Sequence, residues 1–123
     1  MRVTTRLALV VIIGSAAFVP ATSASQSAPR LSEQEARAKA IALLKGDPYG
    51  NSDAEVARNI KQVEWLRDGN TKACGQTRQP AWEFHVVVVT DNKDQFNNGI
   101  IDGYLALDAR TGKIRCTNLP LLN

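Results

Sequence analysis

The spacing of apolar residues changes from a helical pattern to an alternating one along the chain. A stripe at helical spacing comes first and consists of Ala36, Ala40, Ile41, Leu43 and Leu44. Ser32 and Glu35 precede the stripe with the spacing of a capping box, and Gly46 and Pro48 follow it. The pattern predicts an amphipathic helix between Ser32 and Gly46. A second capping box begins at Ser52, which predicts a short helix up to about residue 59.

From residue 60 onward, apolar and polar residues alternate with a period of two, as in half-buried strands. The expected strands span residues 60–67, 81–90, 101–108 and 113–116, with polar loops at 70–80 and 91–99. Trp82 and Phe84 fall on one face of the second strand, and Glu83 and His85 fall on the other. A helix followed by three or four antiparallel strands predicts an α+β fold, with the helix packed on one face of the sheet.

The first 24 residues differ from the rest of the chain. Arg2 and Arg6 precede an apolar run at residues 7–19, and small residues follow up to Ala24. This is the pattern of a secretory signal peptide. As a helix the run would rise only about 20 Å, whereas the hydrocarbon core of a bilayer is roughly 30 Å thick, so we expect no stable membrane anchor. We therefore expect cleavage after Ala24, export to the periplasm or the medium, a flexible lead-in at residues 25–30 and a single domain over residues 31–123.

The charge balance argues against two classes of partner. The chain has 15 Lys and Arg against 12 Asp and Glu, a formal net charge of +3. Two of the arginines belong to the predicted signal peptide, so the remainder is almost neutral. Binding to nucleic acid or to an anionic membrane surface rests on many basic residues, and neither partner is expected here.

The chain contains two cysteines, Cys74 in a polar loop and Cys116 near the C-terminus. In an exported domain of this size a cross-link is a common source of stability, so we expect a Cys74–Cys116 disulfide. Two separate thiols and half of a metal site are the alternatives. There is one His and no C-x-x-C spacing, so the sequence offers too few ligands for a metal.

Catalytic chemistry has little support in the sequence. His85 is the only imidazole, and the serines after residue 24 lie in the lead-in or at helix caps. The loop at residues 91–99 is rich in oxygen ligands but lacks the spacing of a calcium loop. We expect no catalytic residue, no metal and no cofactor, and therefore a protein that is not an enzyme. A small hydrolase that uses carboxylates such as Glu83 and Asp102 is kept as an alternative.

The closing segment carries a resemblance to a known family. A strand opened by Trp82 is followed at residues 103–114 by Gly-Tyr-Leu-Ala-Leu-Asp-Ala-Arg-Thr-Gly-Lys-Ile. This segment resembles the end of PepSY domains, which close with a strand, Asp-Ala-x-Thr-Gly and a short strand. Asp108, Thr111 and Gly112 are the matching turn residues. The resemblance covers roughly residues 31–115, and it implies a helix on an antiparallel sheet and a role in binding and restraining secreted peptidases, without catalytic residues.

Recognition of another protein is the function that the sequence favours. If the helix covers one face of the sheet, the other face presents a mixed polar and apolar surface made of Glu83, His85, Val87, Val89 and Tyr104. The loop at residues 70–80 or a second copy of the chain could cover this face instead. We expect an exported binding domain that restrains a secreted or periplasmic hydrolase. The alternative is an immunity protein that neutralises a delivered bacterial toxin, because such cystatin-like proteins share the outline of a helix and a Trp-opened strand.

Overall fold

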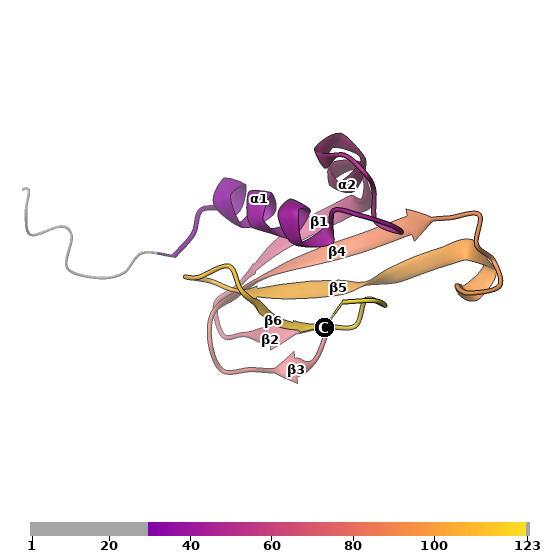
Figure 1. Cartoon of the computed structure of the whole chain (residues 1–123). Coiled ribbons are helices and arrows are strands. Elements are labelled where there is room, and N and C mark those ends of the chain that lie inside the picture. Colours follow the sequence, from indigo (N-terminus) through magenta and orange to yellow (C-terminus); the bar gives the residue numbers. More distant parts are fainter. Residues whose placement is uncertain (1–29, 123) are drawn as a thin grey trace, which may run out of the picture.

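The computed structural model describes residues 30–122, so the predicted signal peptide and residues 25–29 of the predicted lead-in lie outside the described residues. The fold is α+β, as the sequence predicts (Figure 1). Two helices lie on one side of a four-stranded antiparallel sheet with strand order β1-β4-β5-β6. A second sheet, formed by two short strands, lies on the other side. Neither helix in residues 30–122 has the length and apolarity needed to cross a membrane.

Both helices begin at the predicted serine caps. Helix α1 spans Glu33–Leu44, and the Ser32 hydroxyl accepts from the backbone N–H of Glu35 while the Glu35 carboxylate accepts from the N–H of Ser32. Helix α2 spans Asp53–Asn59, and its Ser52 cap accepts from the N–H of Glu55. There the Glu55 carboxylate accepts from the N–H of Asn51, one residue earlier than a standard capping box would place it. The caps satisfy N–H groups that have no partner within the helix.

The main sheet consists of β1 (Ile60–Leu66), β4 (Ala81–Val89), β5 (Ile100–Asp108) and β6 (Ile114–Thr117). These strands match the predicted ones within one residue at each end. The predicted loop at residues 70–80 departs from the expectation, because it contains the hairpin of β2 (Asn70–Thr71) and β3 (Gly75–Gln76). The predicted loop at residues 91–99 is also ordered and ends in a short 3₁₀ turn, η2 (Asn97–Gly99).

The core lies between the helices and the inner face of the sheet. Helix α1 contributes Ala36, Ala40 and Leu44, which follow one another at every fourth residue. Small residues at two of these positions let the helix approach the sheet closely. Leu43, which the sequence analysis places in the apolar stripe, is 39% exposed, so that assignment is wrong. A helix seated on a flat sheet buries a narrow stripe, and Leu43 falls outside it.

The chain beyond β6 crosses to the helix side of the sheet. Asn118 bonds the backbone of Tyr104 on β5, and Leu119 enters the core. A Cβ at Gly103 would lie 2.6 Å from the Asn118 Oδ1, so only glycine permits this crossing. The buried Tyr49 joins this C-terminal segment to the end of α2. Its hydroxyl donates to the carbonyl of Pro120, and its carbonyl accepts from the Asn59 side chain.

Candidate functional site

The candidate site is the sheet face that points away from the helices, here called the open face. Four cross-strand pairs of β4 and β5 place their side chains on it: Glu83 with Ala106, His85 with Tyr104, Val87 with Asp102, and Val89 with Ile100. Residues 70–79, here called the strap, form the small hairpin that lies against this face (Figure 1). The strap divides the open face into a covered half and an exposed half.

In the covered half, Glu83 is a buried carboxylate that holds the strap down. Glu83 as a whole residue is only 2% exposed. The Glu83 oxygens accept from the N–H of Lys72 at 2.9 Å and from the N–H of Ala73 at 3.0 Å. Burial of a charge is tolerated where such hydrogen bonds satisfy it. The assignment of Glu83 to an exposed partner surface is therefore wrong, because the strap occupies the space above it.

A disulfide fixes the strap at a second point. Cys74 and Cys116 are bonded to each other, as the sequence predicts, and their Cα atoms lie 6.3 Å apart. The Thr71 hydroxyl donates to the carbonyl of Gly75 and accepts from the N–H of Cys74, so the turn that carries Cys74 is closed internally. The covered half is therefore held by one covalent bond to β6 and by the carboxylate on β4.

The exposed half begins with a polar cluster around His85. The imidazole stacks on the Tyr104 ring, with 4.6 Å between ring centroids and 16° between planes. His85 Nε2 lies 2.7 Å from Asp102 Oδ1. The Lys72 ammonium lies 5.8 Å from the centre of the Tyr104 ring and 3.3 Å from Glu64, and the Glu64 carboxylate raises the pKa of Lys72. His85 and Tyr104 are half-buried.

The exposed half ends in apolar side chains. Val89 is 80% exposed and its cross-strand partner Ile100 is 48% exposed, while Val87 is half-buried. We call residues 87–89 and 100–102 the arm, because here β4 and β5 extend past the ends of β1 and β6 (Figure 1). Val87 and Val89 belong to the predicted surface, and Ile100 does not, because the predicted strand begins at residue 101 and β5 begins at Ile100.

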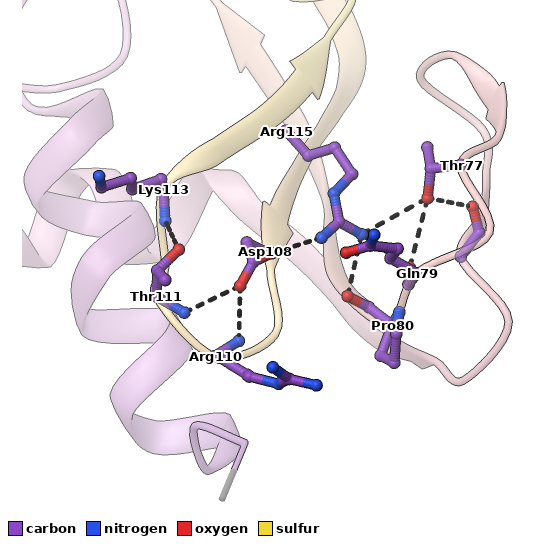
Figure 2. A network of polar contacts seen from close by, with 9 residues as sticks. Thr77, Gln79, Pro80, Asp108, Arg110, Thr111, Lys113 and Arg115 are labelled. Atoms are coloured by element: carbon purple, nitrogen blue, oxygen red, sulfur yellow. Dashed lines mark hydrogen bonds and ion pairs between the residues drawn. The ribbon is translucent and has the colours of Figure 1, made fainter. Parts of the chain in front are cut away.

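The residues that carry the family resemblance form a tight turn at the opposite end of β5, drawn in Figure 2. Asp108 Oδ1 accepts from the N–H of Thr111 at 2.9 Å and of Arg110 at 2.8 Å. The Thr111 N–H is the largest cause of a pKa of Asp108 below its usual value, and the Arg115 guanidinium adds to it. Gly112 has a φ of +74°, and a Cβ there would meet the Lys39 side chain at 2.6 Å. Asp108, Thr111 and Gly112, the residues that match the family motif, therefore form the turn.

Arg115 joins this turn to the start of β4. Its guanidinium pairs with Asp108 and donates to the carbonyls of Gln79 at 2.7 Å and Pro80 at 2.9 Å (Figure 2). The Arg115 side chain therefore links β6 to the end of β5 and to the end of the strap.

A cleft beside the arm has no counterpart in the sequence analysis. It measures about 660 Å³ and lies between the start of α2, the loop after β4 and the C-terminal tail. Three carboxylates line it, those of Asp47, Glu55 and Asp91, together with the apolar Phe96 and Leu121 and with no Lys or Arg. The residues that line the cleft come from three segments more than 20 residues apart, so no local sequence pattern predicts the cleft.

The two serines among residues 30–122 lie at the starts of the helices. Ser32 and Ser52 act as helix caps, which is the role that the sequence assigns to them. No group of three or more His, Cys, Asp or Glu side chains in residues 30–122 is arranged to hold a metal ion. Asp102, one of the carboxylates considered for a hydrolase, lies beside His85, while Glu83 is enclosed by the strap.

Comparisons with protein-family models, with curated proteins and with solved structures find no match to this chain. The resemblance to PepSY domains therefore rests on the strand and turn residues themselves.

Proposed function

We propose that this chain is an exported, non-catalytic binding domain that holds a protein partner on the exposed half of its open face and thereby restrains a secreted or periplasmic hydrolase. One observation carries the proposal. The strap covers and satisfies the half of the open face that contains Glu83, whereas the half that contains Val89 and Ile100 keeps large apolar side chains in water. An uncovered antiparallel face is normally polar, so exposed aliphatic residues on it favour a partner surface.

The proposed partner chemistry follows from the side chains available. His85 and Tyr104 supply aromatic surface with polar edges, and Val89 and Ile100 supply aliphatic surface beside it. Aromatic residues next to aliphatic ones are the composition from which binding hot spots are built. Export is supported by the N-terminal pattern and by the Cys74–Cys116 bond, since disulfides persist in oxidising compartments. The hydrolase, as the class of partner, is supported by the resemblance of the closing turn to PepSY domains.

The proposal is tested by capture followed by an activity assay. The purified protein is cross-linked in the exported fraction of its own source, and each captured protein is identified and assayed for hydrolase activity with and without the protein. We expect one hydrolase whose activity falls on addition of the protein, and we expect Tyr104→Ala to abolish both capture and inhibition. Leu43→Ala is the matched control, because it removes an exposed aliphatic side chain from α1 on the other side of the molecule.

Two results would contradict the proposal. Capture of a toxin that the protein neutralises, without effect on any hydrolase, would establish the immunity function instead. Equal capture by Tyr104→Ala and by Leu43→Ala would show that the open face is not the binding surface.

A further inference from the structure

The arm leaves a strand edge of the sheet without a neighbour. Strands β4 and β5 pair over nine residues each, from Ala81 with Asp108 to Val89 with Ile100. Strand β1 reaches only as far as Val86 of β4. Among the described residues, no strand therefore lies beside Val87 and Val89 on the β1 side of β4. The inner two thirds of β4 are central in the sheet, and the outer third is an edge.

The hydrogen-bond pattern shows which backbone groups point outward from this edge. The Thr90 N–H donates to the carbonyl of Gly99 on the opposite strand. Bonding alternates along an antiparallel pair, so the N–H and C=O groups of Val87 and Val89 point away from β5. Tyr104 on β5 agrees with this alternation, because its N–H and C=O point outward to Asn118. The Ile60–Val86 pair is then of the non-hydrogen-bonded kind, so the Val87 N–H faces the end of α2. The outward groups beyond β1 are the carbonyl of Val87 and the N–H and carbonyl of Val89.

This edge lacks the features that usually protect one. Exposed edges are commonly shielded by Lys, by Pro, by a bulge or by a covering loop. Residues 86–89 are four consecutive valines, and the β4–β5 register is regular through this segment. The side chain of Val89 is 80% exposed. An unprotected edge of this kind accepts an extended segment of another protein by strand addition.

Side chains of an added strand would meet two different environments. On the open face they would lie beside Val87 and Val89. On the helix side they would lie beside Thr90, which lines the cleft with the carboxylates of Asp47, Glu55 and Asp91; the cleft also reaches Val89. Residues 87–103 carry three Asp and one Lys, a formal charge of −2, so the surroundings are acidic as well. Alternate residues of an added strand would therefore face apolar and acidic surfaces.

We infer that the outer edge of β4 receives an extended segment of the partner protein in which apolar and basic side chains alternate. The inference rests on the proposed function, which it deepens by stating the chemistry of the partner's docking segment. The apolar side chains lie against Val87 and Val89, and the basic ones enter the cleft. The pairing of backbone groups supplies affinity, and the two environments supply the register, since a shift by one residue would place every basic side chain on the apolar face.

The test uses a fluorescein-labelled nine-residue peptide of alternating Lys and Val and the purified protein, with fluorescence anisotropy as the readout. Two control peptides carry the same side chains, one with its Lys amides N-methylated and the other with its Val amides N-methylated. A strand that docks through one edge loses binding in only one of these controls. Affinity falls as salt is added, because the charges are partly exposed. Equal affinity of all three peptides would overturn strand addition.

A pair of variants locates the site on the protein. Val89→Lys replaces an apolar contact on the open face with a charged side chain at the strand edge and raises Kd about tenfold or more. Gln34→Lys makes the same change of charge at an exposed residue in the first turn of α1 and leaves Kd within about twofold, because about 15 Å of helix, more than the Debye length of about 10 Å, separates it from the end of α1 that precedes the cleft. Equal weakening by both variants would show nonspecific attraction and overturn the inference.

Three further outcomes separate this inference, a second copy at the edge and the proposed function. If the protein sediments as a dimer that Val89→Lys dissociates and no peptide binds, the occupant of the edge is a second copy and the inference is overturned. If no peptide binds while hydrolase inhibition is still lost in Tyr104→Ala, the edge inference fails and the proposed function stands. If the Lys/Val peptide binds at the edge and no hydrolase is inhibited, the proposed function fails instead.

Discussion

Replacing Glu83 tests whether a buried carboxylate holds the strap on the open face. Its oxygens accept from two backbone N–H groups, those of Lys72 and Ala73, at 2.9 and 3.0 Å. Hydrogen bonds to a charged group contribute about 1.5 to 3 kcal/mol each. Glu83→Gln preserves the shape and one acceptor oxygen but removes the charge, so we expect it to lower the free energy of unfolding by about 2 kcal/mol. In a domain of this size that corresponds to a fall in Tm of about 10 °C.

The assay is thermal and urea unfolding, with hydrogen exchange at the amides of Lys72 and Ala73 as a local readout. Glu64→Gln is the matched control, because Glu64 is the cross-strand neighbour of Glu83 and its side chain is 47% exposed. Its ion pair with Lys72 lies at the surface, so we expect the control to change stability by less than about 0.5 kcal/mol. A Glu83→Gln protein as stable as the control, with unchanged exchange at both amides, would refute the assignment of the strap's anchor to this carboxylate.

Three further predictions concern stability. Reducing the Cys74–Cys116 bond, or replacing both cysteines with Ser, lowers the free energy of unfolding by about 4 kcal/mol on the chain-entropy model, and urea titration of oxidised and reduced protein measures the difference. Burial raises the pKa of Tyr49 to about 12. The neutral phenol therefore stabilises the folded state fully below pH 10, and about 2 to 3 kcal/mol of the free energy of unfolding is lost as the pH rises towards 12. Unfolding measured at alkaline pH checks this, and Tyr49→Phe removes the pH dependence. The pKa of Asp108 is lowered, chiefly by the Thr111 N–H. The Asp108 carboxylate therefore stabilises the folded state above about pH 4, and this stabilisation is lost as the pH falls through the lowered pKa. Asp108→Asn lowers stability by about 1 to 2 kcal/mol at pH 7 and flattens acid unfolding below about pH 4; an unchanged acid profile would contradict the role of Asp108 in the turn.

The parts of the fold that depend on neighbouring residues follow from the sequence. Ser32 and Glu35 predict the start of α1, because a capping box satisfies its own hydrogen bonds within four residues. Alternation between Ala81 and Val89 predicts a strand and assigns each side chain to one of its two faces, since that assignment depends only on the pleat. The Cys74–Cys116 pair follows from the number of cysteines, because two cysteines in one cross-linked domain allow one pairing.

The candidate site shows where this local logic stops. The faces of His85, Val87 and Tyr104 are predicted, but their surroundings are not, because the strap arrives from a segment with no apolar pattern of its own. Glu83 lies on the predicted face and is buried all the same, since the donors that satisfy it are backbone N–H groups, which every sequence contains. The burial of Tyr49 is missed for a similar reason, because its hydroxyl finds its acceptor 71 residues away.

The sequence by itself therefore determined the order of helices and strands, their caps, the two faces of each strand, the turn at Asp108 and the disulfide, because each of these depends on contacts within a few residues or on a count. Only the tertiary structure decided which part of the open face is covered, which strand has a free edge and where the acidic cleft forms. These features depend on where distant segments end relative to one another: β1 ends its pairing at Val86 and the strap ends its cover at Glu83. No periodicity along the chain encodes such relative lengths, and they define the surface from which a function can be proposed.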